Sequence, residues 1–267
     1  MNGVEIFASY SKQPIAEYAG NPLIEALPPI LTDEAAMGLI ANLPYEATAE
    51  ELALERSVRI HCIDRLRSVV QPMLIHLELE SMFSLLIRRG YVGRNPTSPT
   101  TVRHLHSLSG AQRYHDGFKS TAETFSLVGL SGIGKSTALW AILSLYPQTI
   151  KHERFEGKQF VHTQITWLKL DCPRDGSLAG FCQEFFIAVG KAMGDEHYHK
   201  RFRARNINDS LQQMAQVAST FYIGALLIDE IQNLHFAKTG GKDNMLNFFL
   251  HLVNNIGIPV VFIGTNS

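Results

Sequence analysis

Residues 129–136 have the residue types and the spacing of a loop that binds phosphate groups. They read G-x-x-x-x-G-K-S and lie between a short apolar stretch, 124–128, and a helix-favouring stretch, 137–143. Glycines let backbone N–H groups point inward around a phosphate, and the N-terminus of the following helix adds a partial positive charge. The pattern therefore predicts a buried strand, a phosphate-binding loop and a helix in direct succession.

Two side chains of this loop have predicted roles in binding a nucleoside triphosphate. Lys135 would reach the β- and γ-phosphates, and the Ser136 hydroxyl would ligate Mg²⁺. ATP and Mg²⁺ are therefore the predicted cofactors. The remaining predicted contacts are other residues of the loop and the residue after it: Gly129, Ser131, Gly132, Ile133, Gly134 and Thr137.

A pair of carboxylates, Asp229 and Glu230, follows a second apolar stretch, 225–228. The carboxyl ends of parallel strands meet at one edge of a sheet, so this pair would lie at the phosphate site. We expect Asp229 to hold Mg²⁺, directly or through water, and Glu230 to polarise the water that attacks the γ-phosphate. Lys135 and Glu230 are thus predicted catalytic residues, and Ser136 and Asp229 are the predicted metal ligands.

A polar side chain at the end of the last predicted strand, 259–264, would also reach the γ-phosphate and the attacking water. Thr265 and Asn266 are both candidates for this catalytic role, and the sequence does not choose between them. For either residue alone, an ordinary polar strand exit is an equally good interpretation.

The composition describes a globular protein. Of its 267 residues, 45% are hydrophobic and 18% are charged, which excludes a disordered chain. The net charge of −1 means that any contact with DNA must come from a local basic patch. Three cysteines without C-x-x-C spacing predict free thiols in a reducing compartment. No secretory signal and no long apolar run are evident, so we expect a cytoplasmic protein that does not enter a membrane.

The pattern of elements divides the chain into three predicted parts. Residues 1–31 carry four prolines, which predicts an extended arm that lies on another surface, of this chain or of a partner; a flexible tail is the alternative. Residues 32–100 form a mostly helical region and a linker. Residues 101–267 alternate strands and helices, which predicts an α/β fold of the P-loop type, with a three-layer arrangement around a parallel sheet.

Local signals predict where individual elements begin and end. Gly90 is the predicted C-cap of a helix over 72–89, followed by a loop at 90–96 and a linker at 97–101. A single strand is predicted at 164–170. The predicted helix starts are Thr32, Thr48, Ser177 and Asn208.

The order of the elements resembles the AAA+ ATPases, which have an extra strand between the phosphate loop and an Asp-Glu pair. Several short segments narrow this resemblance to TnsC, the ATP-dependent target regulator of heteromeric bacterial transposons, which is related to the TniB proteins. The segments are NPLIEALPP (21–29), GYVGRNP (90–96), LKLDC (168–172), GSL (176–178), IDEIQ (228–232), MLNFF (245–249) and IGT (263–265). The first two make the resemblance specific, because the phosphate loop and the Asp-Glu pair are shared with many ATPases.

The resemblance implies a function in the bacterial cytoplasm. Proteins similar to TnsC assemble with ATP into homo-oligomeric rings or filaments around double-stranded DNA. They link a target-selection protein to the transposase subunits, and ATP hydrolysis resets the assembly. ATP would then act as an assembly ligand that binds the assembled state better than the free one. The N-terminal arm would be the docking surface for the target-selection protein.

The resemblance also implies that this chain is truncated. An AAA+ ATPase continues past the strand at 259–264 with a fifth strand, an arginine finger and a helical lid that carries a second sensor, whereas this sequence ends at Ser267. The missing strand would leave the strand at 124–128 with an unpaired edge. We expect nucleotide binding from this chain and do not count on hydrolysis by it alone.

Two basic segments are the predicted DNA contacts. Arg201, Arg203 and Arg205 form the densest basic cluster, and Lys238 and Lys242 flank a Gly-Gly pair that allows close approach to a phosphate. The alternative for each is an ordinary solvated loop.

Two other functions remain open at this point. One is a signalling ATPase of the AAA+ or STAND type that binds a protein partner and no DNA. The other is a metabolite kinase, which Glu230 disfavours because a carboxylate beside the metal ligand suits the activation of water.

Overall fold

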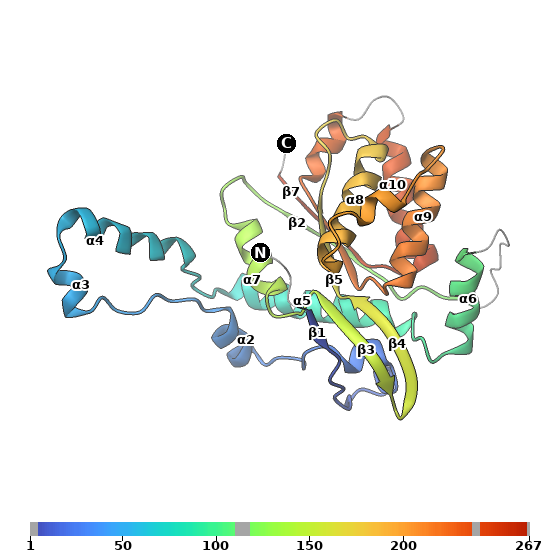
Figure 1. Cartoon of the computed structure of the whole chain (residues 1–267), viewed down its shortest axis with the longest axis horizontal. Helices are drawn as coiled ribbons and strands as arrows, with labels where there is room; N and C mark the ends of the chain where they lie inside the picture. The colour runs from blue at the N-terminus through green and yellow to red at the C-terminus, as the bar shows by residue number, and fades with distance from the viewer. Residues whose placement is uncertain (1–4, 110–117, 237–240, 266–267) are drawn as a thin grey trace.

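The computed structural model describes residues 5–109, 118–236 and 241–265. Its centre is a four-stranded, fully parallel sheet (Figure 1). The strands, in spatial order, are β2 (Thr124–Val128), β7 (Val260–Gly264), β6 (Ala225–Asp229) and β5 (Trp167–Asp171).

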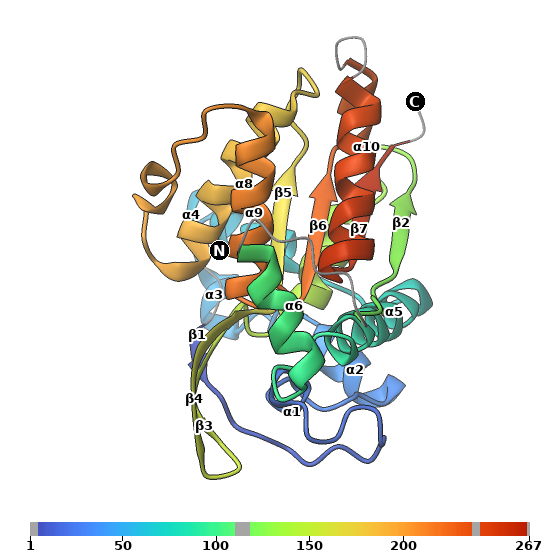
Figure 2. The same cartoon turned by 90° about the vertical axis from the view of Figure 1, so that its right-hand side faces the viewer.

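Both faces of this sheet are covered by helices (Figures 1 and 2). The side chains of β6 alternate between two hydrophobic cores: Leu226 and Ile228 belong to one, and Leu227 belongs to the other. The three layers confirm the predicted α/β fold of the P-loop type. The first core is formed with α8 (Leu178–Met193), α9 (Ile207–Thr220), α10 (Gly241–His251) and the π-helical turn Leu252–Ile256, and the second with α1 (Pro22–Glu25), α2 (Asp33–Ile40), α5 (Leu74–Val92) and α7 (Lys135–Leu143).

Strand β2 lies at the edge of the four-stranded sheet and pairs only with β7 within it. The expected unpaired edge beside the phosphate loop is therefore present. The prediction that this strand is buried is wrong, because Thr124, Ser126 and Val128 are exposed. The reason is positional: a strand with one sheet neighbour keeps part of its surface in water, whatever its hydrophobicity.

A second sheet, which the sequence analysis did not predict, has the strand order β1-β3-β4. The strands are β1 (Glu5–Phe7), β3 (Thr149–Phe155) and β4 (Lys158–Ile165). The tight turn between β3 and β4 consists of Glu156 and Gly157, both with positive φ, at +47° and +78°. A Glu-Gly pair is a weak hairpin signal in sequence, and it went unrecognised.

The single strand predicted at 164–170 is wrong, since it is two strands in different sheets. The chain leaves β4 at Ile165 and enters β5 at Trp167. The residue between them, Thr166, is fully buried, and its N–H donates to the carbonyl of Gln148 at 2.9 Å. Periodicity could not reveal this break, because the apolar pattern continues through it.

Three of the four predicted helix starts are confirmed. The hydroxyls of Thr32, Thr48 and Ser177 each accept an N–H bond at the start of their helices, α2, α3 (Ala49–Ala53) and α8. The fourth is wrong by two residues: Asn206, not Asn208, is the N-cap of α9 and accepts from the Asp209 N–H at 2.9 Å.

Gly90 is not a C-cap, because α5 continues through it to Val92. A Cβ atom at Gly90 would lie 2.4 Å from Cγ of Pro259, so the glycine is required by close packing against the entry to β7. The predicted loop 90–96 therefore begins inside a helix. Another helix, α6 (Pro99–Ser109), begins inside the segment predicted as a linker.

The N-terminal arm packs on this chain's own body. Leu23 and Ile24 are fully buried, and Asn21 Nδ2 donates to the carbonyl of Tyr91 at 2.8 Å. Arg88 Nη2, on α5, donates to the carbonyl of Pro28 at 2.5 Å. The arm is thus part of the second core and fixes the position of α5.

Arg94 joins the end of α5 to the entry of β6. The guanidinium is almost fully buried and donates to the carbonyls of Gly90, at 2.9 Å, and Ile223, at 2.6 Å. Burial lowers the pKa of Arg94 to about 10, which leaves the side chain charged at neutral pH.

One part of the chain projects away from the body (Figure 1). It consists of α3, α4 (Arg56–Cys62) and the 3₁₀ turn Ile63–Ser68, and none of these elements has a buried residue. An ion pair of 2.6 Å between Arg65 and Glu51 ties the turn to α3. None of the helices in the described part of the chain has the length and hydrophobicity needed to cross a membrane.

The three cysteines are free, as predicted, and they differ in exposure. Cys62 is half-buried, whereas Cys172 and Cys182 are buried, and burial raises the pKa of both buried thiols to about 11. Since the ordinary value is 9.0, a rise of this size lowers the reactive thiolate fraction at pH 8 about a hundredfold.

We expect an alkylating reagent to modify Cys62 first and the other two at least a hundredfold more slowly. Mass spectrometry of the native protein would show this, and equal rates at all three would contradict the packing of α8 and β5.

Candidate nucleotide-binding site

The carboxyl ends of the four parallel strands bring the predicted site residues to one edge of the sheet. Asp171 on β5 is in register with Asp229 on β6, and Val128 on β2 with Gly264 on β7. The N–H of Gly129, the first residue of the glycine loop, donates to the carbonyl of Gly264 at 3.3 Å. The loop, the Asp-Glu pair and the end of the last strand therefore lie together, which is where ligands bind in open α/β sheets.

The glycine loop has an open backbone, in a conformation that glycine permits, that suits phosphate. Gly132 and Gly134 have φ of +79° and +94°, which side chains disfavour, and a Cβ atom at either position would meet nothing within 4 Å. Gly134 is the N-cap of α7 and supplies no side-chain cap. The first amides of α7 therefore have no capping side chain, and a helix start of this kind with a glycine loop before it binds anions.

The side chains of the loop stand as follows. The Lys135 ammonium folds back on its own loop and donates to the carbonyls of Gly129 and Leu130, both at 2.8 Å. The residues Ser131, Ile133, Ser136 and Thr137 are all exposed. In the absence of a ligand, the two carbonyls are the hydrogen-bond partners of the ammonium. A bound phosphate would take their place.

Asp229 is nearly buried, and both of its oxygens are occupied. Oδ2 lies 3.0 Å from the ammonium of Lys169, and Oδ1 accepts from the N–H of Glu230 at 2.9 Å. The same ammonium lies 2.7 Å from Asp171 Oδ1. Burial lowers the pKa of Lys169, but its hydrogen bonds to Asp171 and Asp229 outweigh this and raise the pKa above its ordinary value.

Sequence reasoning missed Lys169. The signal was a lysine in the middle of an apolar strand, Trp167–Asp171, whose neighbours are buried on both faces. A charged residue in such a place needs a partner, and only the pairing of β5 with β6 shows that the partner is the carboxylate of Asp229.

Glu230 has a left-handed backbone with φ of +56° and an exposed side chain. Its Oε2 accepts from Nε2 of Gln232, which lies on the 3₁₀ segment Ile231–Phe236. The other end of the same amide, Oε1, accepts from the N–H of Thr265 at 3.2 Å. Gln232, which the sequence analysis also passed over, thus connects Glu230 to the end of β7.

The residues present fit Mg²⁺ and a nucleotide by the chemistry of their donors. Mg²⁺ prefers oxygen ligands and is held in proteins through one or two side chains together with phosphate oxygens. The Ser136 hydroxyl and the Asp229 carboxylate are such ligands, at the start of α7 and the end of β6. Of the two candidates that follow β7, Thr265 lies at this edge. Asn266 lies outside the described residues.

The predicted DNA contacts lie elsewhere or are not described. Arg201 pairs with Asp195 at 2.6 Å, its guanidinium carbon lies 5.3 Å from the ring centroid of Tyr198, and Arg203 and Arg205 are exposed on the loop that follows. In the described part of the chain, the contacts of this cluster are with its own loop and α9, and none is with the glycine loop. Lys238 lies outside the described residues, and so does the side chain of Lys242.

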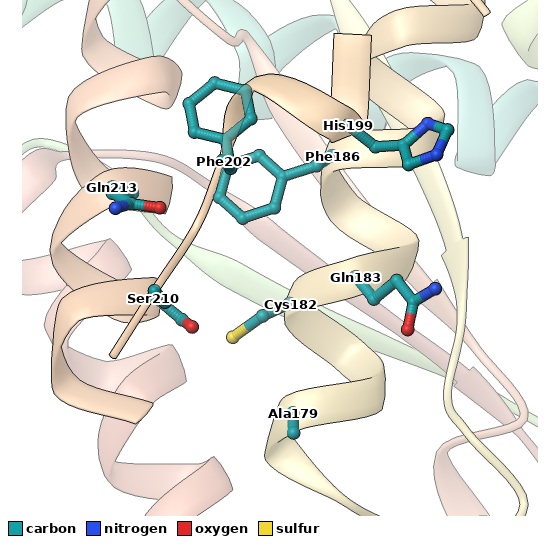
Figure 3. Close-up of a pocket in the computed structure, with 9 residues that line it drawn as sticks. Ala179, Cys182, Gln183, Phe186, His199, Phe202, Ser210 and Gln213 are labelled. Atoms are coloured by element: carbon teal, nitrogen blue, oxygen red, sulfur yellow. The ribbon is translucent and has the colours of Figure 1, made fainter. Parts of the chain in front are cut away.

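A hollow of about 310 Å³ lies beside this basic loop, between α8 and α9 (Figure 3). Phe186 and Phe202 stack in it with their ring centroids 4.1 Å apart. Gln213 also lines the hollow, and its buried Oε1 has no hydrogen-bond partner. The hollow belongs to the packing between the two helices and contains none of the predicted site residues.

Two comparisons with known proteins bear on this arrangement. A protein-family model described as an AAA domain matches residues 119–267, which is more than half of the chain. The matched range contains the glycine loop, Asp229, Glu230 and Thr265. A comparison with curated proteins finds no match.

The pairing of Lys169 with Asp229 generates a test. Replacing Lys169 with Met leaves a nearly buried carboxylate unpaired, and we expect it to lower the free energy of unfolding by about 2 kcal/mol. Added Mg²⁺ should recover more stability in Lys169→Met than in the parent, because the freed carboxylate can take the metal as its counter-charge.

Thermal unfolding with and without MgCl₂ measures both effects. Lys151→Met is the matched control, since it breaks an exposed lysine–carboxylate pair, with Glu5 at 2.7 Å, and should cost less than about 1 kcal/mol with no change in the response to Mg²⁺. An equal response to Mg²⁺ in Lys169→Met and in the parent would count against Asp229 as a metal ligand.

Proposed function

The chain belongs to the AAA domain family, and we propose that it is an ATP-dependent, DNA-binding regulator of transposition that links target selection to the transposase. The observation that carries the nucleotide part is the meeting of an exposed glycine loop, the Asp229–Glu230 pair and Thr265 at one edge of the sheet. The transposition part rests on the resemblance to TnsC in the segments 21–29 and 90–96.

At this edge the chain's own residues would divide the work of ATP hydrolysis. MgATP, when bound, supplies the γ-phosphoryl group and a metal charge that offsets its negative charge. The loop amides and Lys135 would hold the phosphates, and Ser136 and Asp229 would orient the metal. Glu230 would orient the attacking water and accept its proton, and Thr265 or its neighbour would contact the γ-phosphate from β7.

ATP-dependent assembly into a ring or filament is the second part of the proposal. The projecting segment exposes an unusual number of large apolar side chains, which favours its burial in a contact with another copy or a partner. These residues are Leu52, Leu54, Val58, Ile60, Ile63 and Leu66. A nucleotide that binds the assembled state more tightly would shift the equilibrium toward it.

The packing of the arm limits how it could receive a target-selection protein. Leu23, Ile24 and Leu27 are buried in this chain's own core, so these side chains are not free for a partner. Ile30 is about half exposed, and Pro29 beside it is exposed. We propose that a partner contacts this exposed end of the arm, with the buried part serving as its anchor.

Double-stranded DNA would meet the basic residues Arg201, Arg203 and Arg205, together with Lys238 and Lys242. Contacts of this kind address the phosphate backbone, so they are independent of sequence and weaken with salt. The proposal places the protein in the bacterial cytoplasm, beside the transposase subunits. A signalling ATPase that binds only a protein partner is the competing outcome.

The nucleotide dependence of DNA binding tests the proposal as a whole. We expect this chain to bind labelled duplex DNA more tightly with a non-hydrolysable ATP analogue, at two salt concentrations, and to form larger particles. Lys135→Ala should abolish the effect of the analogue, because the loop loses its one side-chain cation. Normal assembly by Lys135→Ala would refute the phosphate-loop assignment. Analogue binding without any DNA binding would favour the signalling ATPase.

The basic cluster has a separate test. Changing Arg201, Arg203 and Arg205 together to Ala should weaken DNA binding at least tenfold and lower the slope of log affinity against log salt by about two to three, one for each lost phosphate contact. A double change of Arg154 and Lys158 to Ala, at exposed positions of β3 and β4, is the control and should leave both quantities nearly unchanged. An unaltered salt slope in the triple variant would remove this loop from the proposal.

A further inference from the structure

We propose that Gln232 is a positioning residue that couples the water-activating carboxylate of Glu230 to the end of β7, where the γ-phosphate would be read. The inference rests on the proposed ATP hydrolysis at this site. It adds Gln232 to the site and a coupling that runs from Thr265 to Glu230. None of the roles assigned above uses Gln232.

The amide of Gln232 has two hydrogen-bond partners. Its oxygen can only accept and its nitrogen can only donate, so each partner matches one end. Oε1 accepts from the N–H of Thr265 at 3.2 Å, and Nε2 donates to Oε2 of Glu230. An N–H group requires an acceptor and a carboxylate requires a donor, so the two contacts fix the orientation of the amide. A rigid planar group of this kind cannot move toward one partner without moving relative to the other.

The packing of β7 leaves room for this bridge only because residue 264 is glycine. A Cβ atom at Gly264 would lie 2.8 Å from Oε1 of Gln232 and 2.7 Å from Cγ2 of Ile231. The φ of Gly264 is not in the left-handed region, so close approach is the reason for the glycine. The same residue accepts the N–H of Gly129, so its carbonyl faces the phosphate loop while its Cα faces the bridge.

The backbone at Glu230 is held in place from the other side. Its φ of +56° is uncommon for a residue with a side chain and persists only where its surroundings fix it. The carbonyl of Glu230 accepts from the N–H of Asn233 at 2.9 Å, and the Asn233 side chain donates to the carbonyl of Cys172 at 2.9 Å. With its backbone fixed, the carboxylate of Glu230 can adjust only through its side-chain torsions, and Gln232 restrains those.

Through the amide of Gln232, the presence or absence of a γ-phosphate near Thr265 would change the orientation of the Glu230 carboxylate. A shift of Thr265 toward or away from a γ-phosphate changes the length of its bond to Gln232 and so the donor offered to Glu230. Oε1 of Glu230 has no described hydrogen-bond partner and stays free to accept a proton from water. Gln232 therefore orients the carboxylate and does not itself touch substrate.

Hydrogen exchange of the Thr265 amide in the nucleotide-free chain tests the bridge directly. Gln232→Ala should accelerate exchange of this amide about tenfold, and Gln212→Ala, at an exposed position on α9, should not change it. Glu230→Ala should also accelerate it, about threefold, although residue 230 does not touch Thr265, because Gln232 loses its other partner. Unchanged exchange in Glu230→Ala would overturn the coupling.

Gln232→Glu separates the two contacts. Its carboxylate can still accept from the Thr265 N–H but can no longer donate to Glu230, which repels it, so exchange of the Thr265 amide should accelerate about threefold, as in Glu230→Ala, and less than in Gln232→Ala. In ATP turnover, both Gln232→Glu and Gln232→Ala should lower kcat at least tenfold, with KM and the affinity for an ATP analogue within twofold of the parent. A Gln232→Glu variant with the kcat of the parent would refute the positioning role.

The outcomes distinguish this inference from the proposed function. Absence of turnover in the parent would remove hydrolysis from the proposed function, and with it the role of Gln232 in orienting a base, whereas the exchange rates would still report whether the bridge exists. Loss of analogue binding in Gln232→Ala would mean that the residue supports the phosphate loop, and would overturn the positioning role.

Discussion

The parallel pairing of β6 with β5 on one side and β7 on the other is the constraint on which the rest of the structure depends. The last residue of each strand lies at or beside the candidate site: Asp171 on β5, Asp229 on β6, and Gly264, which precedes Thr265, on β7. Because all strands run the same way, these ends meet at one edge, and the glycine loop that follows β2 is hydrogen-bonded to it. An antiparallel neighbour would have sent one of these groups to the opposite end of the molecule.

Because this sheet is buried on both faces, the charged groups at its carboxyl edge need partners within the protein. Asp229 is nearly buried, and a lone carboxylate there would be costly, so Lys169 on the neighbouring strand pairs with it. Lys135 likewise satisfies its charge on the carbonyls of its own loop. Both cations thus have protein partners in the ligand-free structure. Under the proposed function, the phosphates and the metal would take over some of these contacts.

The N-terminal third of the chain positions the strands of the candidate site but supplies none of its predicted residues. The buried part of the arm packs on α5, and Arg94 at the end of α5 is bonded to the carbonyl of Ile223, two residues before β6 begins. Gly90 lets the same helix touch Pro259 at the entry to β7. Residues distant in sequence thereby fix the starts of the two central strands, and hence where their ends deliver Asp229 and Thr265.

The sequence by itself determined the glycine loop, the strands that flank it in the sheet, the Asp-Glu pair and most helix starts, because those signals are local: a spacing of glycines, an apolar run, a capping hydroxyl. It placed the end of α5 too early and did not predict the break at Thr166, where packing against Pro259 and the carbonyl of Gln148 outweighs local preference. Only the tertiary structure decided that β2 is an edge strand, that Lys169 neutralises Asp229, and that Gln232 joins Glu230 to Thr265. Each of these is a contact between segments whose adjacency follows from strand order and chain packing, and no periodicity within a single segment encodes it.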